Sequence, residues 1–236
     1  MGNDGRNGAK AVNDSAADDA ATDNASEGES TANNAPASDA AALRARKKEL
    51  RRTFGAERAA LDPTVRAYAD AALADRVAQL PTFASAQVVL TYVSIGDEVD
   101  TRTLIARALA AGKTVAAPRV SGPHVMGWYR IDDVDGLVRS AFGVLEPPAD
   151  EARRIAPDQV EGAIALVPGF AFTPQGYRLG YGGGFYDVFL AGFRGATVGL
   201  CRDEFLRADV GPLEAHDQAV DLVVTPTRTI RCAEER

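Results

Sequence analysis

The sequence has few residues of the kinds that build metal clusters and disulfide frameworks. Its 236 residues include only two cysteines and two histidines. Cys201 and Cys232 are too few for a disulfide scaffold and fit a reducing compartment. Cys201 follows an apolar run and is expected to pack in the core. His124 and His216 are too few and too scattered for a zinc site or a catalytic triad, and we assign neither a catalytic role.

Long apolar segments are missing as well. No stretch approaches the ~18 apolar residues that a membrane-spanning helix needs. The N-terminal segment has no apolar core of a secretory signal, and its acidity is unlike that of a transit peptide. We therefore expect a cytoplasmic protein that makes no membrane contact.

The first 39 residues contain almost no large apolar side chains. They hold eight acidic and two basic residues, a net charge of −6 against −7 for the whole chain. Such a segment cannot bury enough apolar area to offset the entropy of ordering it, which predicts a disordered acidic tail at 1–39. The remaining residues, 40–236, suit a single domain. That domain is nearly neutral, which disfavours a nucleic-acid partner.

The predicted domain alternates helical segments with short apolar runs. Helices are expected over 41–61, 63–80, 100–111 and 184–193, with Asp62 as an N-cap and Pro81 as a stop. Strands are expected in the runs QVVLTYV, TVAAPRV, HVMGWYRI, AIALVPG, ATVGLC and DLVVT. This alternation predicts an α/β fold: a single three-layer domain with a mostly parallel sheet and helices on both faces. Ligands of such sheets bind beyond the carboxyl ends of the strands.

The stretch RLGYGGGFYD, from Arg178 to Asp187, lies between a predicted strand and a predicted helix. It lacks the Lys-Ser/Thr pair of a P-loop, and Phe185 replaces the third glycine of a dinucleotide fingerprint. Glycines before a helix can still bring backbone N–H groups close to a phosphate. Arg178 would add a bidentate grip, and Asp187 could hold Mg²⁺. The alternative is a plain glycine turn flanked by surface charges, and spacing alone does not decide between them.

A longer segment that contains this loop, LVPGFAFTPQGYRLGYGGGFYDVFL, resembles the signature of 5-formyltetrahydrofolate cyclo-ligases, also called methenyltetrahydrofolate synthetases. The segments KKELR, TYVSIGDEVDTRTLI, TVAAPRV, FGVLEPP and HDQAVDLVVTPTRTIR follow the family order, so the resemblance runs from Arg46 to Arg231. It implies that ATP and 5-formyltetrahydrofolate give 5,10-methenyltetrahydrofolate, ADP and phosphate, with Mg²⁺. In that reaction the formyl oxygen is phosphorylated and then displaced.

The resemblance also assigns roles to individual residues. Lys47 and Arg178 are the expected catalytic residues. The expected ATP contacts are Lys47, Arg51, Arg178, Gly180, Gly182, Gly183, Gly184 and Tyr186. The expected folate contacts are Val93, Glu98, Tyr181 and Phe185, and the expected metal ligands are Asp187 and Asp217.

Two uncharged positions in the glycine loop and two further aromatic residues bear on these assignments. Some relatives carry basic residues at the positions of Tyr181 and Gly183, and here both are uncharged, which shifts phosphate binding onto Arg178, Lys47, Arg51 and Mg²⁺. Tyr92 and Trp128 could also stack on a flat ring, but core packing is the better interpretation of both.

Two alternatives belong to other functional classes. The protein could be an inactive nucleotide- or phosphate-binding relative. It could also be an enzyme on a similar sheet, such as a CoA transferase or sugar-phosphate isomerase, that uses an acid such as Glu98 without ATP. In each case we expect small-molecule ligands, no nucleic acid, and a monomer.

Overall fold

The computed structural model describes residues 35–140 and 143–232, and most of the predicted tail lies outside these residues. The first helix, α1, already begins at Ala35. From Pro36 onward the described residues belong to one compact unit. Among the described helices, none combines the length and apolarity needed to cross a membrane.

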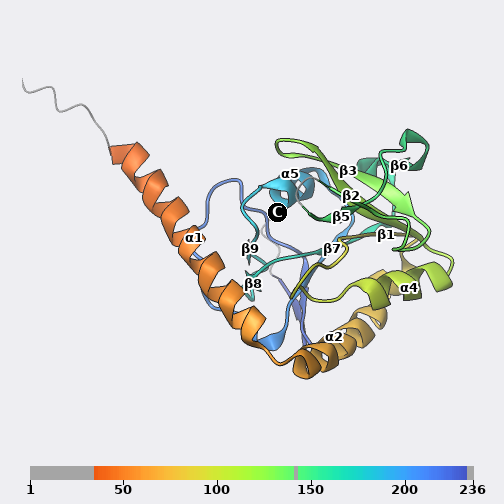
Figure 1. Ribbon diagram of the computed structural model, residues 1–236, viewed down its shortest axis with the longest axis horizontal. Helices are drawn as coiled ribbons and strands as arrows, with labels where there is room; N and C mark the ends of the chain where they lie inside the picture. The colour runs from red at the N-terminus through yellow and green to blue at the C-terminus, as the bar shows by residue number, and fades with distance from the viewer. Residues whose placement is uncertain (1–34, 141–142, 233–236) are drawn as a thin grey trace, which may run out of the picture. The chain divides into compact units, whose positions relative to one another are not determined.

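Among the described residues, an eight-stranded sheet forms the centre of this unit, in the order β12-β11-β10-β7-β1-β2-β3-β6 (Figure 1). The five inner strands from β11 to β2 run parallel, and β12, β3 and β6 pair antiparallel at the two sides. This confirms the predicted mostly parallel sheet. The strands are β1 (Val88–Thr91), β2 (Thr114–Gly122), β3 (Val125–Ile131), β6 (Arg154–Ile155), β7 (Ile164–Val167), β10 (Ala196–Leu200), β11 (Leu222–Val224) and β12 (Thr229–Arg231).

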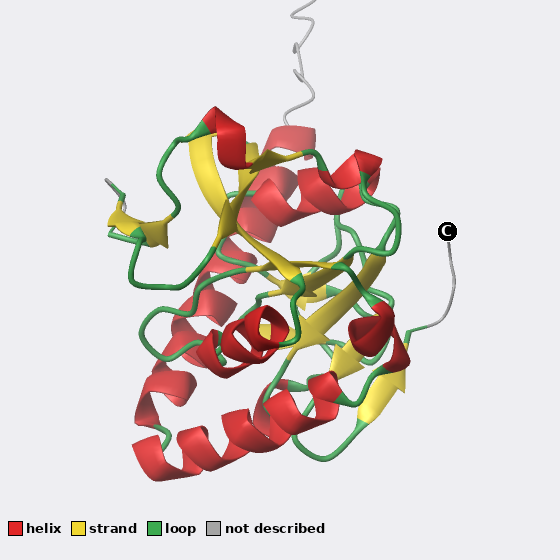
Figure 2. Ribbon diagram, turned by 90° about the vertical axis from the view of Figure 1, so that its right-hand side faces the viewer, coloured by secondary structure: helices red, strands yellow, loops and turns green. Residues whose placement is uncertain are grey.

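Helices cover both faces of the sheet (Figures 1 and 2). Successive side chains of a strand point to opposite faces, so Val89 packs with α2 and α4, whereas Leu90 packs with α1 and α5. The helices are α1 (Ala35–Ala60), α2 (Pro63–Ala78), α3 (Pro81–Ser85), α4 (Arg102–Ala110) and α5 (Phe185–Gly192), with short 3₁₀ turns at Glu151–Arg153, Pro157–Gln159 and Asp203–Phe205. The three-layer α/β prediction is therefore confirmed.

Local sequence signals explain several helix boundaries. The Asp62 carboxylate accepts hydrogen bonds from the backbone N–H groups of Thr64 and Val65, with Pro63 at the first helical position, as predicted for α2. Gly112 follows α4 with a left-handed φ of 74°, which favours glycine. Pro81 does more than end the preceding helix, because it also begins the short helix α3.

Short strands were not predicted from the sequence. β8 (Ala171–Phe172) and β9 (Arg178–Leu179) form an antiparallel hairpin, and β4 (Val138–Arg139) pairs with β5 (Leu145–Glu146). The β8–β9 hairpin follows β7 and leads directly into the glycine loop.

Three neighbouring parallel strands, β10, β7 and β1, send their carboxyl ends to one edge of the sheet. After β1 comes the turn that contains Glu98, after β7 the hairpin and the glycine loop, and after β10 the segment that begins at Cys201. Segments far apart in the sequence therefore converge where ligands of such sheets bind.

Candidate functional site

The backbone conformation of the glycine loop would be strained if its glycines were replaced by other residue types. Gly182 and Gly184 have φ values of 94° and 68°, in the left-handed region that disfavours side chains. A Cβ atom on Gly183 would collide with the ring of Phe185. Three of the glycines are therefore required by geometry, and the loop presents bare backbone.

The loop ends at the N-terminus of α5. Gly184 is the N-cap and offers no side chain to satisfy the first turn. The first N–H groups of a helix have no partner within the helix and carry partial positive charge, so they attract anions. The loop and the helix start together form a surface that suits a phosphate group.

Arg178 and Asp187 bracket this loop and bond to each other. Arg178 Nη2 lies 2.8 Å from Asp187 Oδ1, and Nη1 donates to the backbone oxygen of Gln218 at 2.8 Å. The Arg178 side chain is only 4% exposed, and this burial lowers its pKa. Arg178 is therefore not the surface charge of the plain-turn alternative.

Lys47 and Asp217 lie in the same neighbourhood. Lys47 Nζ lies 2.8 Å from Glu214 Oε2 and 2.9 Å from Asp217 Oδ2. Burial opposes the charge on Lys47, but hydrogen bonds to the two carboxylates outweigh it and raise the Lys47 pKa. The backbone N–H of Gln218, directly after Asp217, donates to Asp187 at 3.3 Å. This contact brings the segments of the two expected metal ligands together.

Arg51 lies against the loop itself. Its Nε donates to the backbone oxygen of Gly180 at 2.7 Å. A Cβ atom on Gly182 would come within 3.2 Å of the Arg51 guanidinium carbon. Burial lowers the pKa of Arg51, although Asp217 and Glu214 act in the opposite direction. Arg51 and Lys47 lie four residues apart on one face of α1, where Arg51 reaches the glycine loop and Lys47 reaches Glu214 and Asp217.

Oxygen ligands for a cation are present beside these basic groups. Ligand atoms of Glu214, His216 and Asp217 lie within 4.8 Å of one another. Carboxylate oxygens are the ligands that Mg²⁺ prefers, so Glu214 and Asp217 suit that ion better than a softer metal. Asp187 is linked to this segment through the backbone N–H of Gln218.

A second group of residues surrounds Glu98. Glu98 Oε2 accepts a hydrogen bond of 2.9 Å from the backbone N–H of Ile95, which closes the turn after β1. Burial raises the pKa of Glu98, and a hydrogen bond with Tyr181 offsets this only in part. The Tyr181 side chain comes from the glycine loop, is half exposed, and packs against Phe170 in a tilted arrangement with ring centroids 4.5 Å apart. Glu98 and the glycine loop therefore border one site.

Three further expected contacts are aromatic or apolar residues with buried or partly buried side chains. Val93 is 5% exposed and packs in the core on the α2 and α4 face. Tyr186 packs edge-on against Trp128, and among the described residues its buried hydroxyl has no hydrogen-bond partner. Phe185 lines a separate pocket of about 370 Å³ together with Trp128 and His124. The structure thus brings together the expected charged residues, Tyr181 and the ring of Tyr186, over which the Arg178 guanidinium lies 6.0 Å from the ring centroid. The roles of Val93 and Phe185 stay predictions.

Tyr92 and Trp128 are both buried, as predicted. Cys201 is buried as well, and burial raises its pKa to about 12.

The structure adds three residues that the sequence analysis did not assign to the site. Arg58 is buried and lies within 3.4 Å of the Tyr181 hydroxyl through Nη1. Glu214 binds Lys47, and His124 Nδ1 lies 2.7 Å from the backbone oxygen of Gly183. Of these three residues, only Arg58 could have been predicted from the sequence, because its helical spacing places it on the same helix face as Lys47 and Arg51.

The burial of Glu98 gives a testable pH dependence. We expect Glu98→Gln to raise the melting temperature of the unliganded protein at pH 7. Below the usual glutamate pKa of 4.5, Glu98 is protonated in both the folded and unfolded states. As the pH rises through the raised folded pKa, the folded protein must bury a charge and loses stability, which the glutamine variant avoids. In melting curves from pH 4 to 8 the difference should widen with pH, and a constant or shrinking difference would contradict this reading.

The fold and the site define an α/β protein with charged side chains gathered at a glycine loop beyond the carboxyl ends of its strands. The profile of the 5-formyltetrahydrofolate cyclo-ligase family matches residues 43–226. The probable 5-formyltetrahydrofolate cyclo-ligase of Schizosaccharomyces pombe is 32% identical over 170 residues, 66% of this chain and 83% of that protein. The Escherichia coli K12 5-formyltetrahydrofolate cyclo-ligase is 30% identical over 66% of this chain and 86% of that one.

A solved structure agrees with these matches. The NMR structure of Aquifex aeolicus 5,10-methenyltetrahydrofolate synthetase is 31% identical, with a TM-score of 0.68 over 80% of this chain and 94% of that one. The chain therefore belongs to the 5-formyltetrahydrofolate cyclo-ligase family. This confirms the predicted family and its ligase activity, with ATP as the co-substrate, and it disfavours a CoA transferase or an isomerase.

Proposed function

We propose that the glycine loop binds the terminal phosphate of ATP and presents it to the formyl oxygen of 5-formyltetrahydrofolate. The observation that carries this proposal is the convergence of Arg178, Asp187, Lys47 and Asp217 around the loop, joined through the backbone of Gln218. Burying charged side chains costs free energy unless they are paired and hydrogen-bonded. A cluster of such charges at one loop therefore supports a functional role for the loop.

The chemistry requires activation of a poor electrophile. In a formyl amide the nitrogen lone pair is delocalised into the carbonyl group. Attack of the formyl oxygen on the terminal phosphorus of ATP releases ADP and turns that oxygen into part of a leaving group. The position-10 nitrogen then attacks the same carbon and gives up its proton, the ring closes, and phosphate departs with the former formyl oxygen. The protein has mainly to align the groups and offset negative charge.

The residues around the loop divide this task. Lys47 and Arg51 would bind the nucleotide phosphates from α1, and the backbone of Gly180 and of 182–186 would line the terminal phosphate. Arg178, held in place by Asp187 and Gln218, would supply fixed positive charge next to the transferred group.

Asp187 and Asp217, with Glu214 beside them, would hold Mg²⁺. The ion would supply charge neutralisation of the phosphate oxygens when bound. The two aspartates each bond to a basic side chain through one oxygen, Asp187 to Arg178 and Asp217 to Lys47.

The folate would lie between the Glu98 turn and Tyr181. The carboxylate of Glu98 can accept hydrogen bonds from the amino-pyrimidinone edge of the pteridine ring, and the exposed face of Tyr181 can stack on that ring. Val93 and Phe185 would contribute apolar surface near these groups.

A direct assay tests this function. Purified protein with Mg²⁺ and ATP should convert 5-formyltetrahydrofolate to a methenyl product, followed by its near-ultraviolet absorbance. Omission of ATP should abolish the product. ATP binding without product would support an inactive relative, and turnover of a CoA ester without ATP would support the transferase alternative.

Lys47→Met should weaken nucleotide binding. The substitution removes a positive charge and leaves Glu214 and Asp217 to repel the phosphates. Because a hydrogen bond to a charged group contributes ~1.5–3 kcal/mol, we expect the KM for ATP to rise at least about ten-fold. The KM for folate should stay near the wild-type value.

Lys48→Met is the matched control, because Lys48 is the next residue on α1 and is exposed. It should leave both KM values unchanged. Equal effects of the two variants, or an unchanged KM for ATP in Lys47→Met, would remove Lys47 from the nucleotide site.

A further inference from the structure

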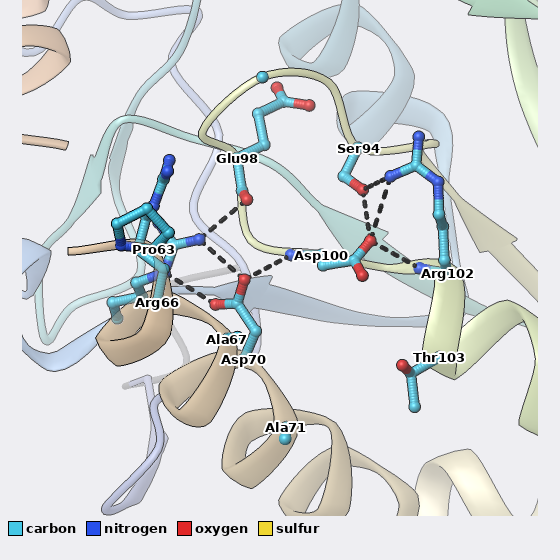
Figure 3. A pocket seen from close by; sticks show the side chains of 12 residues that line it. Pro63, Arg66, Ala67, Asp70, Ala71, Ser94, Glu98, Asp100, Arg102 and Thr103 are labelled. Carbon is cyan, nitrogen blue, oxygen red and sulfur yellow. Dashed lines mark hydrogen bonds and ion pairs between the residues drawn. The ribbon is translucent and has the colours of Figure 1, made fainter. Parts of the chain in front are cut away.

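A buried ion pair contacts the backbone of the turn that carries Glu98, and Figure 3 shows one of its members, Asp70, next to that turn. Arg202, after β10, and Asp70, on α2, form two hydrogen bonds: Nε to Oδ1 at 2.7 Å and Nη2 to Oδ2 at 2.8 Å. Their side chains are only 2% and 10% exposed. Both line the wall of a pocket of about 480 Å³ that Glu98 also borders.

The pair holds the backbone of the turn at three points. Arg202 Nη1 donates to the carbonyl oxygen of Asp97 at 2.9 Å, and Nη2 donates to that of Glu98 at 2.9 Å. The Asp70 carboxylate accepts from the backbone N–H of Asp100 at 3.0 Å. Figure 3 shows the Asp70 carboxylate beside the backbone of Asp100, while the Glu98 carboxylate points away from Asp70. All three guanidinium nitrogens of Arg202 are thus engaged within the protein, which argues against a ligand role.

Stability alone does not explain why the protein has a buried ion pair between Arg202 and Asp70. Removing two charges from water is costly, and well-packed apolar residues of similar size often stabilise a fold as well or better. Three fixed hydrogen bonds on a short turn, however, set the direction of the side chain that the turn carries. An apolar pair could not hold the carbonyl oxygens of Asp97 and Glu98 in this way.

We infer that Asp70 and Arg202 are positioning residues that fix the turn so that the Glu98 carboxylate meets the pteridine ring of the folate. This inference rests on the proposed folate contact of Glu98. It assigns neither Asp70 nor Arg202 a contact with substrate.

A comparison with Arg58 explains why substitution of Arg202 should affect folate binding and not ATP binding. Arg58 also approaches the turn, with Nε 3.3 Å from the Asp97 oxygen, but it reaches the Tyr181 hydroxyl and the Gly169 oxygen as well. Arg58 therefore joins the turn to the glycine-loop side. Among the described residues, the side chain of Arg202 hydrogen-bonds only with Asp70 and the turn, so its loss should disturb the folate half of the site.

The test is Arg202→Lys, which keeps a positive charge for Asp70 but cannot donate to both carbonyl oxygens from a planar fork. Because displacement of a binding group by ~1 Å can cost up to about 10²-fold, we expect the KM for folate to rise between about ten- and one-hundred-fold. The KM for ATP should stay near wild type. A purely structural defect would instead lower the melting temperature and impair both substrates. Asp70→Asn serves as the second variant if Arg202→Lys does not fold.

Arg66→Lys is the matched control. Arg66 lines the same pocket, and among the described residues its side chain makes no hydrogen bond to the turn. It should leave the KM for folate unchanged.

A double-mutant cycle with Glu98→Gln separates the inference from the function on which it rests. If Arg202 acts through Glu98, Arg202→Lys should add little to the KM for folate in the Glu98→Gln background. If Glu98→Gln raises this KM but Arg202→Lys does not, or the two effects multiply, the positioning role is wrong and the folate contact stands. If Glu98→Gln leaves the KM unchanged, the proposed folate contact itself fails.

Discussion

Arg178→Ala is expected to lower kcat by at least about 10²-fold, the usual cost of removing one group that stabilises charge in a transition state. Arg178 is buried, is fixed by Asp187 and Gln218, and lies beside the glycine loop. A fixed, desolvated cation stabilises developing charge on a phosphoryl group without reorganising during the reaction. The loss should therefore appear in kcat at saturating ATP and folate, and rapid-mixing or steady-state kinetics would measure it.

The same substitution has a structural cost that must be separated from catalysis. Removal of Arg178 leaves Asp187 half-buried without its partner, and breaking a buried pair can cost ~3–5 kcal/mol of stability. Circular dichroism should establish that the assayed protein is folded, and Arg178→Lys should recover part of the rate. Arg194→Ala, at an exposed arginine just after α5, is the control. A folded Arg178→Ala protein with a near-normal rate would exclude Arg178 from the mechanism.

Glu98→Gln is expected to raise the KM for folate at least about thirty-fold. Removing one partner of a buried, charge-assisted contact costs ~2–5 kcal/mol of binding free energy. Glutamine keeps the size of the side chain and can still accept the N–H of Ile95, so the turn should remain closed. The KM for ATP should not change, because the contacts of Glu98 lie on the turn and on Tyr181.

Glu161→Gln provides the control for this prediction, because Glu161 lies in an exposed turn before β7. Both variants change one carboxylate to an amide and alter the net charge equally. An unchanged KM for folate in Glu98→Gln, measured alongside this control, would show that the pteridine ring binds elsewhere.

Local signals in the sequence predicted the features that depend on neighbouring residues. The helix cap at Asp62 and Pro63 and the glycine loop before α5 are set by residues within a few positions of each other. The alternation of strands and helices likewise predicted the parallel sheet. The strands of two residues, such as β9, were missed because a run that short has no periodicity to detect.

The contacts between distant segments could not be predicted in this way. Asp70 and Arg202 are 132 residues apart, and Lys47 and Glu214 are 167 residues apart. In the sequence each of these residues looks like an ordinary surface charge, and its contact forms only when the fold brings the two segments together. The expected roles of Lys47, Glu98 and Asp217 came from the family resemblance, since spacing alone left each as a solvated charge or a turn.

The uncharged loop positions also gain a physical interpretation. The sequence places Tyr181 and Gly183 where some relatives have basic residues. In the structure the Arg51 guanidinium lies against Gly182, and Arg58 lies next to the Tyr181 hydroxyl. Positive charge therefore reaches the loop from α1 instead of from the loop itself.

The central claim is that the formyl oxygen itself receives the terminal phosphoryl group of ATP. The most direct test uses 5-formyltetrahydrofolate labelled with ¹⁸O in the formyl group and turned over by the protein with Mg²⁺ and ATP, followed by mass spectrometry of the released phosphate. Transfer to the formyl oxygen requires that the label appear in inorganic phosphate, one atom for each methenyl product. Product formed with unlabelled phosphate, in a control where the substrate has kept its label, would show that the loop does not deliver phosphate to that oxygen.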